Sequence, residues 1–400
     1  MALRWIEGFD VSRDQTALGR IYTGSLTSLS TDLNEESPAE DRGPGGSGAF
    51  FDSAASEDDA ILHTPALVGS PENTWIVGFA FRSDDSLSLV TGGTAPYVAL
   101  HNTDGEQVRI EVYEYTPVSA KPGGLYYGWR VMRGASEIAK TEQAFSLSDI
   151  SDSSWVYFEF KVTIDNTVGS IEGRFRRLKT ASNPSGGFET LTWDASVTNV
   201  DTQNQTSAGA DSFVMSFATG AVSDNSAYDS LYVCDSTGAK NNDFLGRCFV
   251  TPMKITTVGG GDGDTTEWTL QTATDTEDAW QELATSVEDD DRLTSDVVGQ
   301  IHLAQMGGVS GTMDFMDQAS IIGVRMDLHA RMETTGDLDL GFMWRKTTGT
   351  PAQTEFGTAL NVDSTTMEAQ AVIAEDDPNT LADWIFADLD SIQLGVVNNG

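Results

Sequence analysis

Two stretches of this 400-residue chain alternate strictly between large apolar side chains and other residues. A period of two places every second side chain on the same face of an extended strand. Strands of this kind bury one face and turn the other toward solvent or a second layer, which is typical of antiparallel sheets. The apolar sets are Trp75, Val77, Phe79 and Phe81 in residues 75–82, and Val156, Phe158, Phe160 and Val162 in residues 155–162.

Further short apolar runs, separated by clusters of Gly, Ser, Thr, Asp and Asn, predict many more strands. A helical pattern is expected only for a few turns around residues 279–284. The chain is therefore predicted to be all-β and to form a β-sandwich or jelly roll. The other strands are expected at residues 2–11, 60–62, 97–101, 107–115, 126–133, 169–176, 213–219, 231–234, 297–306, 319–332, 338–346, 366–373 and 391–397.

A sequence pattern that occurs twice in the chain indicates two domains. The pattern of residues 229–233, Asp-Ser-aliphatic-x-aliphatic, returns at residues 390–394 near the C-terminus. We expect each copy to be the closing strand of a β-domain. The predicted boundaries are 1–235 for the jelly-roll domain, 236–266 for a junction with a Gly/Asp loop, and 267–400 for a second β-rich domain. Residues 31–48 are acidic and then rich in Pro and Gly, which predicts a loop.

Charge excludes several kinds of partner. The chain has 61 acidic and 23 basic residues, giving a net charge of −38. Nucleic acids and anionic membranes repel such a surface, because binding to them requires Lys and Arg. No secretory or membrane-spanning segment is predicted, so we expect synthesis in a cytoplasm without insertion into a membrane.

Possible metal sites come from loops rich in oxygen ligands. Asp262 and Asp264 lie in a Gly/Asp loop, and Asp235 and Asp243 flank an Asn-containing turn. Ca²⁺ prefers carboxylate and amide oxygens, and it is the only cofactor that the sequence admits. The competing interpretation is that Asp, Asn and Gly are ordinary turn residues. No EF-hand spacing or zinc pattern is present.

The two cysteines, Cys234 and Cys248, lie at either side of the same turn. A disulfide across the hairpin is one alternative. Two reduced, half-buried thiols are the other, and we favour this alternative because a disulfide scaffold needs more cysteines in a shorter chain.

No catalytic residue is predicted. Glu159 lies on the outward face of its strand between Tyr157 and Lys161, but a glycosidase needs two carboxylates and this strand offers one. A solvated glutamate is the simpler interpretation. Nucleophile and phosphate-binding motifs are missing too. We therefore expect a protein that is not an enzyme. Trp129, Tyr126 and Tyr127 are candidates for stacking on a sugar, with packing inside the sheet as the alternative.

The chain resembles a family of tailed-phage virion proteins with a concanavalin-like (laminin-G-type) jelly roll. The resemblance is one of pattern over most of the chain, and it implies a virion component whose first and last strands lie side by side in one sheet. Two features depart from the family: Tyr228 stands where a second Asp often precedes Asp229, and the 31–48 loop is long and acidic. The matching segments are RWIEGFD (4–10), WVYFEFKVTI (155–164), YDSLYVCDSTG (228–238), NNDFLGRCFV (241–250), DPNTLADW (377–384) and SIQLGV (391–396).

Three functions follow as hypotheses. The first is a non-enzymatic structural protein on the virion surface, with a tail-associated, fibre-like role in host adhesion preferred. The second is a capsid decoration protein, and the third is a carbohydrate-binding module. The resemblance implies that the protein is located in the virion. The expected partners are other virion proteins, further copies of the chain in a homo-oligomer, and a host surface glycan.

Overall fold

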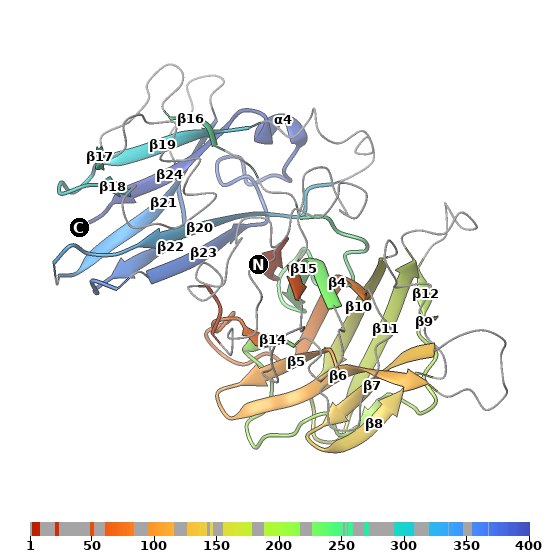
Figure 1. Ribbon diagram of the computed structural model, residues 1–400. Helices are drawn as coiled ribbons and strands as arrows, with labels where there is room; N and C mark the ends of the chain where they lie inside the picture. The colour runs from red at the N-terminus through yellow and green to blue at the C-terminus, as the bar shows by residue number, and fades with distance from the viewer. Residues whose placement is uncertain are drawn as a thin grey trace. The chain divides into compact units, whose positions relative to one another are not determined.

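The alternating stretches form long strands in a computed structural model of the chain. The structure describes residues 2–8, 21–23, 49–51, 61–83, 95–115, 126–141, 145–146, 155–177, 188–216, 226–250, 253, 255–258, 268–271, 292–307, 320–334, 336–346, 354–366 and 368–400. Its elements are almost all strands, so the predicted all-β class is confirmed. Figure 1 shows the strands of each part of the chain. In the described part of the chain, no helix is long and apolar enough to cross a membrane.

The chain divides into two compact units. The first comprises the described residues of Met1–Asp10 and Tyr22–Thr251, and the second those of Val11–Ile21 and Pro252–Gly400. Residues 236–250, the first part of the predicted junction, thus belong to the first unit. Two sandwiched sheets form this unit, and both are antiparallel.

Sheet A of the first unit contains the two segments with the clearest alternation. Its strand order is β1-β15-β4-β10-β11-β12, with β2 paired to β15 and β13 to β11. The first strand pairs with the last, because Trp5 lies opposite Val233 and Glu7 opposite Leu231. This pairing is the one expected of a concanavalin-like jelly roll. The strands are β1 (Leu3–Glu7), β2 (Ala49–Phe51), β4 (Thr74–Ser83), β10 (Val156–Thr163), β11 (Gly169–Arg177), β12 (Glu189–Thr190), β13 (Thr198–Val200) and β15 (Ser226–Asp235).

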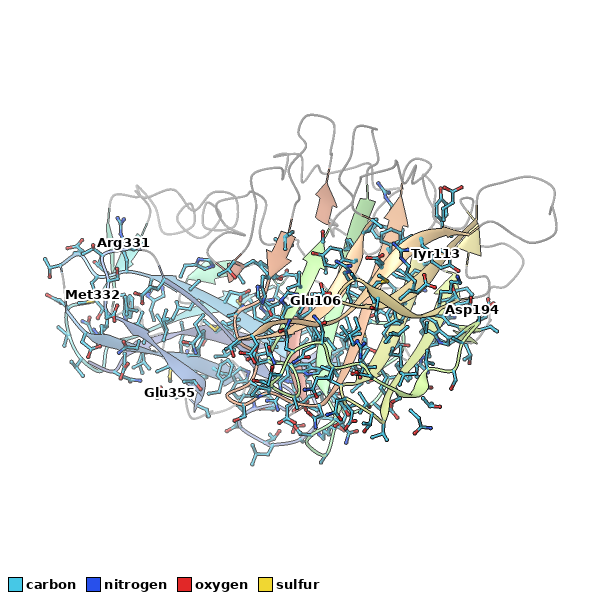
Figure 2. The ribbon with its side chains drawn as sticks, turned by 90° about the horizontal axis from the view of Figure 1, so that it is seen from below. Glu106, Tyr113, Asp194, Arg331, Met332 and Glu355 are labelled. Atoms are coloured by element: carbon cyan, nitrogen blue, oxygen red, sulfur yellow. The ribbon has the colours of Figure 1, made fainter. Side chains whose placement is uncertain are left out.

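Sheet B has the strand order β3-β14-β5-β6-β7-β8, with β9 paired to β7. Glu106 and Tyr113, labelled in Figure 2, lie near the two ends of its longest strand, β6. Its strands are β3 (Ile61–His63), β5 (Tyr97–Asn102), β6 (Gly105–Tyr115), β7 (Tyr126–Arg133), β8 (Ser136–Lys140), β9 (Phe145–Ser146) and β14 (Ser212–Ser216).

Aromatic side chains fill the space between the two sheets. The Trp129 ring from sheet B contacts Phe158 and Phe160 from sheet A, with ring centroids 5.0 and 5.3 Å apart. Phe79 lies against both phenylalanines and against Tyr228. Edge-to-face contacts of this kind add to the free energy gained by burying the rings. The alternating apolar residues of the sequence therefore form the core, as predicted.

The second unit is also built from strands. A five-stranded sheet has the order β16-β19-β24-β21-β22, and β17–β18 and β20–β23 form two-stranded sheets. The core is formed around Trp344 and Trp384, whose ring centroids lie 5.9 Å apart. Its elements are β16 (Ile255–Val258), β17 (Thr269–Gln271), β18 (Arg292–Thr294), β19 (Ile301–Met306), β20 (Val324–Ala330), β21 (Leu338–Lys346), β22 (Thr354–Val362), β23 (Glu368–Ala374), α4 (Phe386–Leu389) and β24 (Ile392–Asn398).

The second unit differs from the sequence expectations in two ways. Strands β16, β17, β18 and β22 were not predicted, and residues 386–389 form the short helix α4 before strand β24 begins. The helical turns expected around residues 279–284 lie outside the described residues.

Candidate functional site

The outward face of sheet A gathers charged and aromatic side chains at its centre. Glu159 on β10 lies between Gly78 of β4 and Arg174 of β11 in the strand register. On the far side of Gly78 is Tyr232 of β15. A Cβ atom at position 78 would come within 2.1 Å of the Tyr232 ring. The glycine therefore lets the tyrosine lie across the strand and reach Glu159.

Glu159 is completely buried, with 0% of its surface exposed. The Arg174 Nε donates to its Oε2 over 2.6 Å, and the Gly246 backbone N–H donates to its Oε1 over 2.8 Å. The Tyr232 hydroxyl also donates to Oε1. Burial, and next the neighbouring Glu159 charge, hold the pKa of Tyr232 well above its usual value, so this hydroxyl keeps its proton. The expectation of a solvated Glu159 is wrong, because further protein covers this face.

The cover is a segment that follows strand β15, here called the strap and defined as residues 241–248. Its Leu245 N–H donates to the Tyr232 oxygen over 3.2 Å. The Arg174 guanidinium lies over the ring of Phe244, which belongs to the strap, and over the ring of Phe188, 4.4 Å from each centroid. Glu159 and Arg174 thus hold the strap through a backbone hydrogen bond and a stacked cation, which closes the centre of the face.

A second carboxylate lies near this centre. The sequence pattern of β10 did not reveal it, because it belongs to the neighbouring strand. Glu172 on β11 is opposite Lys161, so it is the diagonal cross-strand neighbour of Glu159. Side chains in this relation are close enough to act together. Only Glu172 is exposed, however, and the Glu159 oxygens are occupied by three donors. In this arrangement Glu159 serves the packing of the strap.

Of the four aspartates predicted as metal ligands, the two that the structure describes, Asp235 and Asp243, are each bound to other groups of the protein. The Asp235 carboxylate is buried and accepts from the Arg4 Nε over 2.5 Å and from the Thr237 N–H over 2.8 Å. Asp243 is exposed and pairs with Lys161 over 3.1 Å; the Phe244 N–H is the main cause that lowers its pKa. Asp262 and Asp264 lie outside the described residues. Among the described residues, no cluster of three or more acidic, His or Cys side chains fits a metal ion.

The candidates for sugar stacking lie in strand β7. Trp129 and Tyr127 have 0% of their surface exposed. Trp129 packs on the phenylalanines of the core, so the packing interpretation applies to it and a sugar has no access to its ring. The Tyr127 ring is equally closed to a ligand. The side chain of Tyr126 lies outside the described residues.

The two cysteines are both buried thiols. The Cys248 Sγ lies 3.5 Å from the Gly246 carbonyl oxygen, within the strap. This arrangement matches the reduced-thiol alternative of the sequence analysis.

The outward face of sheet B carries a ladder of charges. Glu111 accepts from the Arg130 Nε over 2.5 Å, and the Arg109 Nε lies at ion-pair distance, 2.9 Å from the other carboxylate oxygen. The Arg109 guanidinium lies 5.2 Å from the Tyr97 ring centroid. Arg130 retains 36% exposure of its side chain, so this face offers hydrogen-bond donors to a ligand. Sequence reasoning missed this ladder, because it becomes visible only once the register of β5, β6 and β7 is known.

Beside this ladder lies a pair of histidines. The rings of His63 on β3 and His101 on β5 meet edge to face, with centroids 5.2 Å apart. The His63 Nε2 is 3.0 Å from the Ser212 hydroxyl, which in turn donates to Asp211 over 3.0 Å. Burial, then the nearby His63 and Arg109, lower the pKa of His101 to about 4. Both rings are therefore neutral near pH 7.

No family model matches the chain, and no curated protein matches it. Several solved structures are similar over about half of it. The VIP36 exoplasmic/lumenal domain bound to Ca²⁺ and Man3GlcNAc is 12% identical with a TM-score of 0.28, covering 49% of this chain and 84% of that one. A protein of unknown function with a galectin-like fold from Bacillus subtilis is 11% identical with a TM-score of 0.27, covering 58% and 96%.

A third similar structure is an enzyme. The catalytic domain of the glycoside hydrolase family 131 protein from Coprinopsis cinerea is 9% identical with a TM-score of 0.29, covering 58% of this chain and 94% of that one. At these identities and TM-scores, the function has to be argued from the residues of the chain itself.

Proposed function

We propose that the protein is a non-enzymatic structural component of a tailed-phage particle, and that its first unit acts in host adhesion by binding a carbohydrate. The sequence resemblance supports the virion assignment. The β-sandwich and the polar face of sheet B support carbohydrate binding. Sugars are recognised by arrays of hydrogen-bonding groups. Arg130, the most exposed member of the ladder, offers its guanidinium here, and the buried Glu111 holds it in place.

The observation that carries the non-enzymatic part of the proposal is the state of Glu159. A glycosidase carboxylate has to reach the glycosidic oxygen or the anomeric carbon of its substrate. The Glu159 carboxylate is fully buried under the strap and is held by Arg174, Tyr232 and Gly246. Sheet A therefore supplies a structural face, and the ligand is assigned to sheet B.

A glycan array with the purified full chain tests carbohydrate binding. We expect selective binding to a small group of glycans, reduced at least about tenfold by Arg130→Ala, which removes donors without opening the core. Lys161→Ala on sheet A is the matched control and should bind normally. Repeating the array with a chelator tests the calcium hypothesis for Asp262 and Asp264. A flat array would contradict the proposal.

Hydrolysis assays on any bound glycan test the absence of catalysis. We expect no released sugar from the wild type, nor from Glu172→Gln. Turnover by the wild type that is lost in Glu172→Gln, while glycan binding persists, would contradict the non-enzymatic assignment.

Cryo-electron microscopy of the native particle tests the location. Density on the tail alone is expected for the adhesion role. Copies spaced regularly over the capsid would instead establish the decoration alternative, and their symmetry would give the oligomeric state.

A further inference from the structure

A lysine and two aspartates meet in the second unit. The Lys346 Nζ lies 2.6 Å from the Asp388 Oδ1 and 3.1 Å from the Asp377 Oδ2. The side chains are largely buried, with 20% of Lys346, 12% of Asp388 and 0% of Asp377 exposed. Buried ion pairs contribute little net stability, because the cost of removing charges from water offsets their attraction. Stability alone therefore does not account for this cluster.

Three different elements bring the groups of the cluster together. Lys346 ends strand β21, Asp377 follows strand β23, and Asp388 lies in helix α4. The Lys346 Nζ is 6.0 Å from the centroid of the Trp344 ring, which packs on Trp384 in the core. The cluster thus lies against an apolar wall, where electrostatic interactions and hydrogen bonds are stronger than in water.

The two oxygens of the Asp377 carboxylate have different surroundings. Oδ1 accepts from the Asn379 N–H over 2.8 Å and from the Thr380 N–H over 3.4 Å. Oδ2 is buried beside the Lys346 ammonium and accepts no aligned hydrogen bond from the described residues. Backbone N–H groups that point at such an oxygen stabilise the negative charge that forms on it when a nucleophile attacks the carbon. Oδ1 is therefore held as an oxyanion would be, and Oδ2 is the oxygen that can leave.

Asp388 is placed to accept a proton from the lysine. Its Oδ1 contacts Nζ, and its Oδ2 accepts from the Ile385 N–H over 3.3 Å, which fixes the carboxylate. Burial alone lowers the pKa of Lys346 and raises that of Asp377. The hydrogen bonds and charges of the cluster outweigh burial, so the pKa of Lys346 is raised and that of Asp377 is lowered. The cluster rests as an ion pair, and a base has to take a proton from Nζ before its lone pair can react.

We propose that Lys346 and Asp377 join their side chains in an isopeptide bond, an amide that the folded chain forms by itself. Asp388 takes a proton from the Lys346 Nζ, the lone pair of the nitrogen forms a bond to the Asp377 Cγ, and the Cγ–Oδ2 bond breaks. Asp388 passes its proton to Oδ2, which takes a second proton from the nitrogen and leaves as water. The third proton of the ammonium stays on the amide nitrogen, so one ammonium and one carboxylate become one amide and one water.

The bond ties strand β21 to the segment that follows β23. Such a crosslink restricts the unfolded chain as a disulfide does, but it does not depend on redox conditions. It lies in the second unit and does not depend on the carbohydrate site of the first.

Intact-mass spectrometry of the purified full chain tests the proposal. We expect a mass lower by one water molecule than the sequence requires, and after proteolysis a branched peptide that joins Lys346 to Asp377. Lys346→Arg keeps the positive charge but lacks the reactive amine, so it should have the full mass. Asp388→Asn removes the base and should slow crosslinking at least about hundredfold. Lys161→Arg is the matched control and should keep the crosslink, because the Lys161–Asp243 pair, also 3.1 Å apart, is exposed to water.

Asp377→Asn gives a second readout. The asparagine presents the same carbon with an amide nitrogen as the leaving group, so this variant should lose ammonia and reach the same final mass as the crosslinked wild type. A folded wild type that keeps the full mass of its sequence after incubation to constant mass would overturn the proposal. So would a missing water located at other residues, or a bond from Lys346 to Asp388. The wild-type mass decides even where a variant does not fold, and these outcomes are independent of the glycan array.

Discussion

Replacing Arg174 by methionine is expected to lower the free energy of unfolding of the first unit by about 3–5 kcal/mol. The methionine keeps the apolar stem of the arginine but removes the only cation within ion-pair distance of Glu159 among the described residues. The carboxylate would then be buried without its counter-charge, which is the costly half of a broken buried ion pair. The stacking of the guanidinium on Phe188 and on Phe244 is lost as well. Urea unfolding followed by tryptophan fluorescence measures the change.

A second variant separates the effect of the unpaired buried charge from the effect of the lost packing. Glu159→Gln removes the negative charge but keeps an oxygen that accepts from Tyr232 and Gly246. We expect the double variant Glu159→Gln/Arg174→Met to recover about half of the loss seen with Arg174→Met alone. Lys161→Met is the matched control, because its pair with Asp243 is exposed and contributes at most about 1 kcal/mol. Equal losses for Lys161→Met and Arg174→Met would show that the buried charge is not the cause.

The fold was predictable wherever the sequence alternates with period two. In the segments of strands β4 and β10, apolar residues occupy every second position, and this set, which includes Phe79 and Phe158, is the buried face in the structure. Strand β22 was missed because Gly357 adopts a φ of 74° and interrupts the alternation, while the register against β21 shifts between Leu340 and Phe342. A residue with positive φ interrupts the alternation of apolar and polar side chains along the strand. The backbone pairing with β21 nevertheless keeps the segment in the sheet.

The candidate site was much less predictable. Alternation placed Glu159 on the outward face correctly, but a pattern within one strand does not reveal what covers that face. Its cover comes from the strap, about 87 residues further along the chain by the Gly246 contact. Likewise, the alternation of β7 could not decide whether Trp129 faces the core or a ligand, because the choice depends on which strands lie across from it. The charge ladder of Arg109, Glu111 and Arg130 depends on cross-strand register in the same way.

Lowering the pH from 7 toward 4 is expected to destabilise both units through buried neutral histidines. His101 in the first unit and His302 in the second both have a pKa lowered to about 4, mainly by burial. The unfolded chain binds these protons near pH 6.5, so it gains protons first as the pH falls. The free energy of unfolding is thus unaffected above about pH 6.5 and declines between there and about pH 4. A shift of this size corresponds to at most about 3 kcal/mol for each histidine.

The groups around His101 make its contribution specific. His101 lies against His63 and near Arg109, so its protonation brings positive charges together. Asp211 is the acidic group near His63. Urea unfolding at pH 7.5, 6.5, 5.5 and 4.5 should give a steep loss of stability for the wild type. His101→Gln should flatten this dependence for the first unit, and His302→Gln for the second, whatever each variant does to stability at pH 7.5. A variant whose dependence on pH matches that of the wild type would show that its histidine does not carry the effect, because the paired carboxylates that titrate at lower pH remain in both proteins.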